Sequence, residues 1–319
     1  MPGRQLKVGP KVWWFGCCFF LLLHRVCGVS RVVFLADTHV GEGCNSSYSG
    51  YELNDTNCYS VRDLKATVAK INELHLKDDA VPFSLVLLGG DVTSSAQPTE
   101  FVAARKELDT LLAPYLSIMG NHDVWSYNEV VGDLTPTPVA DRLFAETFRS
   151  SFEKFHGPFF TYGNKTVYNP AHQCNSTFQS WSLEGGSSAI QNNNDLANVK
   201  FIAPDFNTRV KAPPPCPGHS PIGGCGVPGM AELFNFTKGT LKWFEQEVVG
   251  NIRRTVETVI FMIHQPFRCR FGVPDWAFCF SKDDKKAIRD IIRRSTTPLD
   301  KFWGVLAGHQ HRWFNGTAF

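Results

Sequence analysis

Five short apolar segments, each followed at once by polar side chains, set the strongest constraint on the fold of this chain. Each segment has five or six residues, most of them apolar, and each contains at least one β-branched residue. Segments of this kind are typical of strands that are buried on both faces, as in the parallel sheets of α/β proteins. The predicted strands span residues 31–36, 83–88, 115–119, 259–263 and 302–307.

Amphipathic segments with helical spacing lie between some of these strands. The first covers residues 60–71 and the third covers residues 281–292, and both begin with the Ser-x-x-Asp spacing of a capping box. The second covers residues 101–112. Because helices alternate with strands, we predict an α/β fold, in which ligands bind where loops leave the carboxyl ends of the strands.

A long stretch at about 124–258 differs in composition, since it is rich in Asn, Pro, Gly and Phe. Within it, residues 210–229 alone hold six prolines and five glycines. Such a composition is typical of loops and turns. We therefore predict a long, loop-rich insertion over one rim of the sheet, not a second independent core.

Residues 1–28 have the pattern of a secretory leader. The first eleven carry three positive charges, residues 12–23 are all apolar or glycine, and small residues close the segment. Twelve helical residues rise ~18 Å, well short of the ~30 Å hydrocarbon core of a bilayer. We predict a cleaved signal peptide. The alternatives are an uncleaved signal anchor, with Trp13 and Trp14 at the membrane interface, and a buried N-terminal helix or strand.

The charge of the chain is concentrated in this leader. The whole chain has a net charge of +2, but residues 1–28 contain four basic residues and no acidic one, which leaves −2 for the domain predicted over residues 29–319. That domain shows no clustered basic segment, so we do not expect nucleic-acid binding. A hydrophobic content of 43% excludes an intrinsically disordered chain.

Glycosylation sequons support a secretory route, because the chain carries more of them than its composition would give by chance. The predicted acceptors are Asn45, Asn54, Asn164, Asn175, Asn235 and Asn315.

The cysteines support the same route. Three of the ten lie in the leader, and six of the other seven can form short-range disulfides in an oxidising compartment. The candidate pairs are Cys44 with Cys58, Cys216 with Cys225, and Cys269 with Cys279. Cys174 is then left without a local partner.

Polar residues that follow the predicted strands form a set of metal ligands. The set holds two carboxylates, one amide and four imidazoles, and these oxygen and nitrogen donors suit Mn, Fe or Zn. Seven ligands are too many for one tetrahedral ion, but they fit two divalent or trivalent ions that share a bridging carboxylate. The predicted ligands are Asp37, His39, Asp91, Asn121, His264, His309 and His311.

Two such ions would carry more positive charge than the two carboxylates neutralise, so the centre would attract a phosphate group. The ions would also lower the pKa of a shared water molecule toward neutrality. A single histidine at a strand end is more often an ordinary core or surface residue than a ligand. Here every member of the set lies at the same end of a predicted strand, which favours a dinuclear metal centre.

The order and spacing of these residues resemble the five motifs of the calcineurin-like metallophosphoesterase superfamily. The resemblance covers residues 31–313 and implies a four-layer αββα sandwich with the metal centre at the strand ends. The motifs are Asp37-x-His39, Gly90-Asp91, Gly120-Asn121-His122-Asp123, His264 and Gly308-His309-x-His311.

The resemblance also implies a role for each residue. By motif, Asp37, His39 and His311 would bind one metal, Asn121, His264 and His309 would bind the other, and Asp91 would bridge them. A metal-bound hydroxide would attack phosphorus in line. His122 would stabilise the developing charge or protonate the leaving alkoxide, and Asp123 would orient His122.

The resemblance defines the substrate less well. Purple acid phosphatases are similar, but they have a Tyr ligand where Ser94 stands and no histidine at the position of His39, so an iron–tyrosinate centre is not expected. His264-Gln265-Pro266 is similar to the His-x-Pro of class III cyclic-nucleotide phosphodiesterases. The secretory features instead resemble acid sphingomyelinase-like phosphodiesterases. We expect hydrolysis of a phosphate monoester or diester and leave the two specificities open.

We therefore expect a metallophosphoesterase with a phosphoester substrate, located outside the cell, in a lysosome or vacuole, or tethered at the cell surface. The alternative from another class is a non-catalytic secreted scaffold that keeps the fold, and the lack of Cys ligands disfavours a structural zinc protein. Only eight residues follow His311, whereas family members continue with further strands. A missing C-terminal segment would supply a partner for Cys174 or a membrane anchor.

Overall fold

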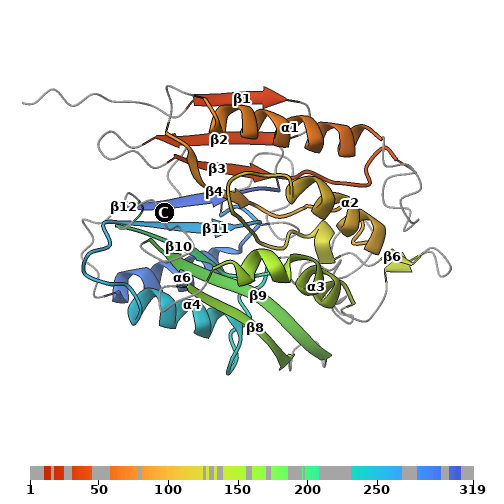
Figure 1. Cartoon of the computed structure of the whole chain (residues 1–319). Coiled ribbons are helices and arrows are strands. Elements are labelled where there is room, and N and C mark those ends of the chain that lie inside the picture. The colour runs from red at the N-terminus through yellow and green to blue at the C-terminus, as the bar shows by residue number, and fades with distance from the viewer. Residues whose placement is uncertain are drawn as a thin grey trace, which may run out of the picture.

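Two five-stranded sheets form the centre of the protein in a computed structural model (Figure 1). The first sheet has the order β1 (Lys11–Phe15), β2 (Cys18–His24), β3 (Arg31–Ala36), β4 (Phe83–Leu88) and β5 (Tyr115–Ser117). The second has the order β12 (Phe302–Ala307), β11 (Thr258–Ile263), β10 (Val199–Ala203), β9 (Cys174–Glu184) and β8 (Phe160–Asn169). The structure describes residues 11–15, 18–24, 31–44, 58–77, 81–124, 127–128, 133–134, 139–155, 160–169, 174–185, 196, 198–207, 231–267, 279–295 and 302–309.

The helices fall into two groups. One group, α1 (Tyr59–His75), α2 (Pro98–Leu108) and α3 (Val139–Glu153), belongs to the core that includes the first sheet. The other group, α4 (Thr240–Val249) and α6 (Lys282–Arg294), belongs to a second core on the other face of the second sheet (Figure 1). After β5 come a 3-10 turn, η1 (His122–Val124), and a small ribbon of β6 (Tyr127–Asn128) and β7 (Asp133–Leu134).

Alternate residues of the second sheet face these two cores. Phe201 and Ala203 of β10 lie in the core shared with the first sheet, whereas Ile202 packs with α4 and α6. Trp181 of β9 is fully buried and donates a hydrogen bond of 2.8 Å to the Ser117 carbonyl of β5, which links the two sheets directly. These contacts confirm the predicted four-layer αββα sandwich.

Parallel pairing brings the predicted ligands to one edge. β3, β4 and β5 pair in parallel, and so do β10, β11 and β12, so their carboxyl ends lie together and the loops that leave them are neighbours. The predicted strands at 31–36, 83–88, 259–263 and 302–307 are present to within one residue at each end. The strand predicted over 115–119 is shorter, since β5 ends at Ser117.

The prediction of a loop-rich insertion over residues 124–258 is wrong for much of that range. β8, β9 and β10 supply three of the five strands of the second sheet, and α4 packs against its outer face. Buried positions of β9 include Ser180, Ser182 and Glu184, so no continuous apolar run marks this strand in the sequence. The proline-rich stretch at 210–229 lies outside the described residues.

Two of the three predicted helices begin or end at other residues than predicted. The N-cap of α1 is Cys58, and Ser60 lies inside the helix, where its hydroxyl accepts a hydrogen bond from the Gly41 N–H at 3.2 Å. α2 ends at residue 108 instead of 112, because Asn72 of α1 holds the following turn through hydrogen bonds to residues 110 and 112. The capping box of α6, between residues 281 and 284, is present as predicted.

The predicted disulfide between Cys44 and Cys58 is present, with the two Cα atoms 4.8 Å apart. It ties the loop that follows β3 to the first turn of α1. Cys279 is also disulfide-bonded. The other predicted disulfide cysteines, Cys269, Cys216 and Cys225, lie outside the described residues.

Part of the predicted leader forms strands, since β2 pairs antiparallel with β3 and β1 pairs with β2. This arrangement corresponds to the N-terminal strand given above as an alternative to a signal peptide, and cleavage of a signal peptide stays a prediction. Within the described ranges, no helix combines the length and the apolar character needed to cross a bilayer.

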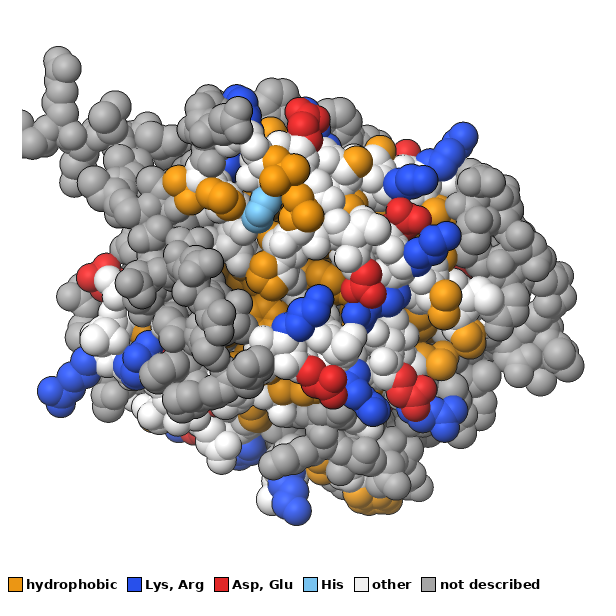
Figure 2. Space-filling model, in the orientation of Figure 1, with side chains coloured by type: hydrophobic (Ala, Val, Ile, Leu, Met, Phe, Trp, Pro, Cys, Tyr) orange, Lys and Arg blue, Asp and Glu red, His pale blue; other side chains and the backbone are white. Residues whose placement is uncertain are grey.

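One predicted glycosylation site can be placed on the surface: Asn235 is exposed in the turn before α4. Asn164 and Asn175 belong to the backbones of β8 and β9. The remaining predicted acceptors, Asn45, Asn54 and Asn315, lie outside the described residues. Elsewhere on the described surface, basic and acidic side chains are interspersed on the face shown in Figure 2.

Candidate metal centre

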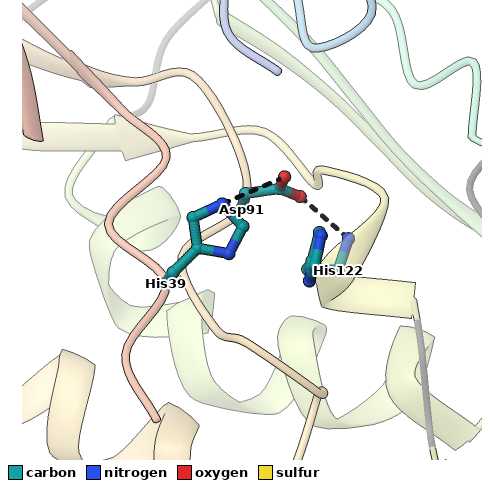
Figure 3. A group of neighbouring side chains, drawn as sticks. All are labelled: His39, Asp91 and His122. Carbon is teal, nitrogen blue, oxygen red and sulfur yellow. Dashed lines mark hydrogen bonds and ion pairs between the residues drawn. The ribbon is translucent and has the colours of Figure 1, made fainter. Parts of the chain in front are cut away.

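Asp91, which follows β4, is the most central of the predicted ligands. Its carboxylate is buried, and its Oδ1 accepts a hydrogen bond of 2.8 Å from the backbone N–H of His122. Its Oδ2 lies 3.6 Å from His39 Nε2 and 3.2 Å from His264 Nε2. One carboxylate therefore faces histidines from both sheets, and Figure 3 shows the side formed by His39 and His122.

Asn121, His264 and His309 form a second cluster beside Asp91. Asn121 Oδ1 lies 2.8 Å from His264 Nε2 and 2.7 Å from His309 Nδ1, and these two nitrogens are 3.3 Å apart. Ligand atoms of Asp91, His264 and His309 all lie within 4.8 Å of one another, and so do those of Asp91, His39 and His122. Asp91 belongs to both groups, as a ligand shared by two ions would.

The hydrogen bond of His264 to the main chain leaves its other ring nitrogen, Nε2, facing the cluster. His264 Nδ1 lies 2.9 Å from the Gly89 carbonyl, and because a carbonyl only accepts, this nitrogen carries a proton. In the neutral ring, Nε2 then presents a lone pair toward the Asn121 oxygen and the Asp91 carboxylate, which also present lone pairs. Lone pairs that converge in this way repel one another unless a proton or a metal ion lies among them. The residues present therefore fit a metal ion with oxygen and nitrogen ligands.

The pKa shifts of this pair have the same cause. Burial would raise the pKa of Asp91, but the histidines His264, His122 and His39 hold it well below its usual value. Burial would lower the pKa of His264, but the Asp91 carboxylate raises it to about 9. The buried carboxylate thus favours positive charge beside it, whether carried by a proton or by a metal ion.

Main-chain hydrogen bonds fasten the loop after β3 to the loop after β4. The N–H of Asp37 donates to the Gly90 carbonyl at 3.0 Å, and the N–H of His39 donates to the Asp91 carbonyl at 2.9 Å. The Asp37 carboxylate in turn accepts a hydrogen bond of 2.7 Å from the backbone N–H of His309, at the end of β12. Asp37 and His39 therefore lie in the loop that follows β3, as residues after a predicted strand should.

Several predicted ligands have a left-handed backbone, which costs a residue with a side chain ~1–2 kcal/mol. Strain of this kind persists only where the surrounding structure holds it, and it is concentrated at functional sites. The φ angles are 58° at Asp37, 42° at His39, 51° at Asp91 and 71° at His309.

His122 lies in η1 next to the first group of ligands. Its Nδ1 is 2.8 Å from the Ser94 carbonyl, so Nδ1 carries a proton and Nε2 is the nitrogen that can exchange one. Its ring meets the ring of His39 edge-on, with the centroids 4.4 Å apart. This position also brings His122 close enough to Asp91 and His39 for all three to bind one ion, although His122 is not among the seven predicted ligands.

The hydrogen bonds of Asp123 do not go to His122, contrary to the predicted role. Its carboxylate accepts hydrogen bonds from the backbone N–H groups of Val92, Thr93 and Gly120 and from the Thr93 hydroxyl, at 2.8–3.2 Å. These bonds fasten the loop after β4 to the loop after β5. Burial, and then the neighbouring Asp91 carboxylate, raise the pKa of Asp123 to about 6.

Glu100 holds the other end of the loop after β4, and the sequence prediction missed it. It is the third residue of α2, it is buried, and its carboxylate accepts hydrogen bonds from Ser95 and Gln97. The spacing Gln97-Pro98-x-Glu100 is that of a capping box, so the signal was present in the sequence.

Gln265, part of the motif similar to cyclic-nucleotide phosphodiesterases, is buried and donates a hydrogen bond to Asn207. Asn207 donates in turn to the Met119 carbonyl at 2.8 Å. This chain of hydrogen bonds joins the loops after β11, β10 and β5, a structural role that the sequence did not indicate. His311, the last predicted ligand, lies outside the described residues.

The site depends on close approach at Gly120, where a Cβ would lie 2.1 Å from Asp91 Oδ1. We predict that Gly120→Ala displaces Asp91 and weakens metal binding by about 10–100-fold, measured as metal content after dialysis. Gly250→Ala, at the C-cap of α4, is the control, because its Cβ would only touch a carbonyl at 3.1 Å. Wild-type metal content in a folded Gly120→Ala variant would contradict this geometry.

The buried Glu100 predicts a specific pH dependence of stability. Burial raises its pKa from 4.5 to about 7, so the folded protein binds this proton more tightly than the unfolded chain does. Its contribution to the free energy of unfolding therefore grows as the pH falls from 7 toward 4.5 and is lost as the pH rises.

We predict that the free energy of unfolding of wild type, minus that of Glu100→Gln, decreases between pH 4.5 and 7 by up to about 1.4 kcal/mol per pH unit. Urea unfolding at pH 5, 6, 7 and 8 measures this difference. Asp123 also titrates in this range, but it does so in both proteins, so its contribution cancels to first order. A difference that stays constant, or that grows with pH, would show that the proton is not bound more tightly in the folded state.

Comparison with known proteins agrees with this geometry. The model of the calcineurin-like phosphoesterase family matches residues 30–313. None of the curated proteins matches the chain. Because the match covers most of the chain, including β3 to β12 and every loop that carries a predicted ligand, the chain belongs to the calcineurin-like phosphoesterase family.

Proposed function

We propose that this protein hydrolyses a phosphate monoester or diester at a centre of two metal ions. The observation that carries the proposal is the convergence of Asn121, His264 and His309 beside the shared Asp91 carboxylate, a buried set of oxygen and nitrogen ligand atoms. Members of the family are generally hydrolases of phosphoester bonds, which agrees with this chemistry.

The proposed ligands divide between two ions. Asp91 would be shared, since its Oδ2 lies between His39 and His264. When bound, the ions would supply positive charge to phosphate oxygens and lower the pKa of a water molecule. The donor set suits Mn, Fe or Zn. By motif, Asp37, His39 and His311 would hold one ion, and Asn121, His264 and His309 the other.

We assign the protonation of the leaving group to His122. The Ser94 carbonyl retains the proton on Nδ1, so an imidazolium at this position gives up its Nε2 proton. As the bond from phosphorus to the leaving oxygen breaks, that oxygen takes the proton, and His122 remains as the neutral ring with Nδ1 protonated. The edge contact with His39 keeps this ring beside the first metal site.

A secretory location is also proposed. The Cys44–Cys58 disulfide and the disulfide-bonded Cys279 support an oxidising compartment, and the exposed Asn235 supports glycosylation. The signal peptide, the remaining sequons and a membrane tether are part of the same proposal.

We predict that His122→Ala lowers turnover of an unactivated phosphate ester by about 10²–10⁴-fold and leaves the metal content unchanged. Asp91→Ala is the matched comparison, since it should lower both metal content and turnover. Turnover and metal content are measured on the same preparations. Equal loss of metal in the two variants would make His122 a ligand and would refute its assignment as the proton donor.

Two substrates separate the classes that the sequence left open. Preference for p-nitrophenyl phosphate would indicate a monoesterase, and preference for bis-p-nitrophenyl phosphate would indicate a diesterase. A protein that binds two metal ions but hydrolyses neither with Mn, Co, Zn or Fe would support the non-catalytic scaffold instead.

A further inference from the structure

The carboxylate of Glu100 accepts hydrogen bonds from two peptide units of the loop after β4. Oε2 accepts hydrogen bonds from the backbone N–H of Ser95 at 2.9 Å and of Gln97 at 3.1 Å. Oε1 lies 3.0 Å from the Ser95 hydroxyl. Gly41 leaves room for this side chain, because a Cβ at that position would lie 2.0 Å from Oε1. Two loops therefore hold Glu100 in place.

One of these two peptide units, between Ser94 and Ser95, also contacts His122. The carbonyl of Ser94 and the N–H of Ser95 belong to the same planar trans peptide, so they point in opposite directions. Glu100 accepts from the N–H on one side, and the His122 ring meets the carbonyl on the other side at 2.8 Å. Because the unit is rigid, fixing its N–H also fixes the direction of its carbonyl.

Other groups hold the neighbouring peptide units: on the far side, the Gln97 side chain donates to the Ser95 carbonyl at 3.2 Å. The N–H of Ser94 donates to the Val40 carbonyl at 2.9 Å, which fixes the preceding peptide unit. Asp123 holds the N–H groups of residues 92 and 93. Ala96, which follows, has a left-handed φ of 54°, a conformation that needs support from its surroundings.

We propose that Glu100 is a positioning residue for His122: through the Ser94–Ser95 peptide it aims the carbonyl that keeps the proton on Nδ1 and so makes Nε2 the proton-exchanging nitrogen. The inference rests on the proposed function only in the use of His122 as the proton donor. The hydrogen-bond chain itself is independent of which ester is hydrolysed.

The charge of Glu100 is not what the geometry requires. A neutral carboxylic acid can donate from Oε1 to the Ser95 hydroxyl while Oε2 accepts from the two N–H groups. The amide of Glu100→Gln can make the same bonds, whereas Glu100→Ala makes none of them. The pair of variants therefore separates hydrogen bonding from the presence of an acidic group.

If Glu100 only capped α2, its replacement would lower the stability of the protein without changing the tautomer of His122 or the turnover. Ser281→Ala is the control for this reading, since it removes the capping box of α6, where Ser281 accepts from the Asp284 N–H at 3.1 Å. Loss of such a cap lowers the stability of the helix. We expect Ser281→Ala to behave as wild type in both measurements that follow.

The first measurement is the tautomer of His122 at pH 8, read from the ¹⁵N chemical shifts of its ring and assigned by comparison with His122→Ala. We expect the Nδ1-protonated tautomer in wild type and in Glu100→Gln. In Glu100→Ala we expect a shift toward the Nε2-protonated tautomer. An unchanged tautomer in a folded Glu100→Ala variant would overturn the proposal, whether or not any ester is hydrolysed.

The second measurement is turnover of phosphate esters with graded leaving groups, from p-nitrophenol to a simple alcohol. Glu100→Ala should lose about 10–100-fold on the alkyl ester and little on the p-nitrophenyl ester, because only the poor leaving group needs the proton. Glu100→Gln should stay within about threefold of wild type on both. Equal loss on all esters in Glu100→Ala, or a Gln variant as impaired as the Ala variant, would overturn the proposal. A wild type that hydrolyses none of them would refute the proposed function, while the tautomer still decides the role of Glu100.

Discussion

The carboxylate of Asp91 is the group on which the site depends. A buried carboxylate is costly unless charges and hydrogen bonds compensate it, and here the compensation comes from both sheets. The His122 N–H and His39 approach it from loops of the first sheet, and His264 approaches from the second. The site therefore forms only when the two sheets pack face to face, which the buried Trp181 and its hydrogen bond to the Ser117 carbonyl help to secure.

Hydrogen bonds to buried carboxylates hold the loop that follows Asp91 on both sides of Ser94. Asp123 holds its first half and Glu100 holds its second half, and both are buried carboxylates whose pKa values are raised. Each accepts hydrogen bonds from the backbone of the loop instead of contacting a metal ligand. Between the two halves lies the Ser94 carbonyl, which faces His122. The loop thus connects a proposed shared ligand to the proposed proton donor through a few rigid peptide units.

The ligand set could be predicted from the sequence because its signals are local. Each apolar strand and the polar residue after it are adjacent in the chain, and parallel pairing alone then brings them to one edge. Gly90 and Gly120 were part of the same local motifs, and the structure gives the reason for them: a Cβ at either position would meet the backbone of the neighbouring loop.

The strands β8, β9 and β10 of the second sheet could not be predicted, since they carry polar residues that find partners only in the folded protein. Ser182 of β9 and Lys200 of β10 are buried and both bind Glu247 of α4. No local pattern distinguishes such residues from those of a loop, so residues 124–258 read as an insertion. The hydrogen bonds of Asp123 were not predicted for a similar reason: its partners Val92 and Thr93 are 31 and 30 residues away along the chain.

The most direct test of the account is anomalous X-ray diffraction from crystals of the metal-loaded protein, with data collected at the absorption edge of the bound metal. We predict two anomalous peaks at this edge of the sheets, both at about 2.0–2.2 Å from carboxylate oxygens of Asp91, with His264 beside one and His39 beside the other. A single peak, or two peaks of which only one contacts Asp91, would contradict the claim that this carboxylate is shared between two metal ions.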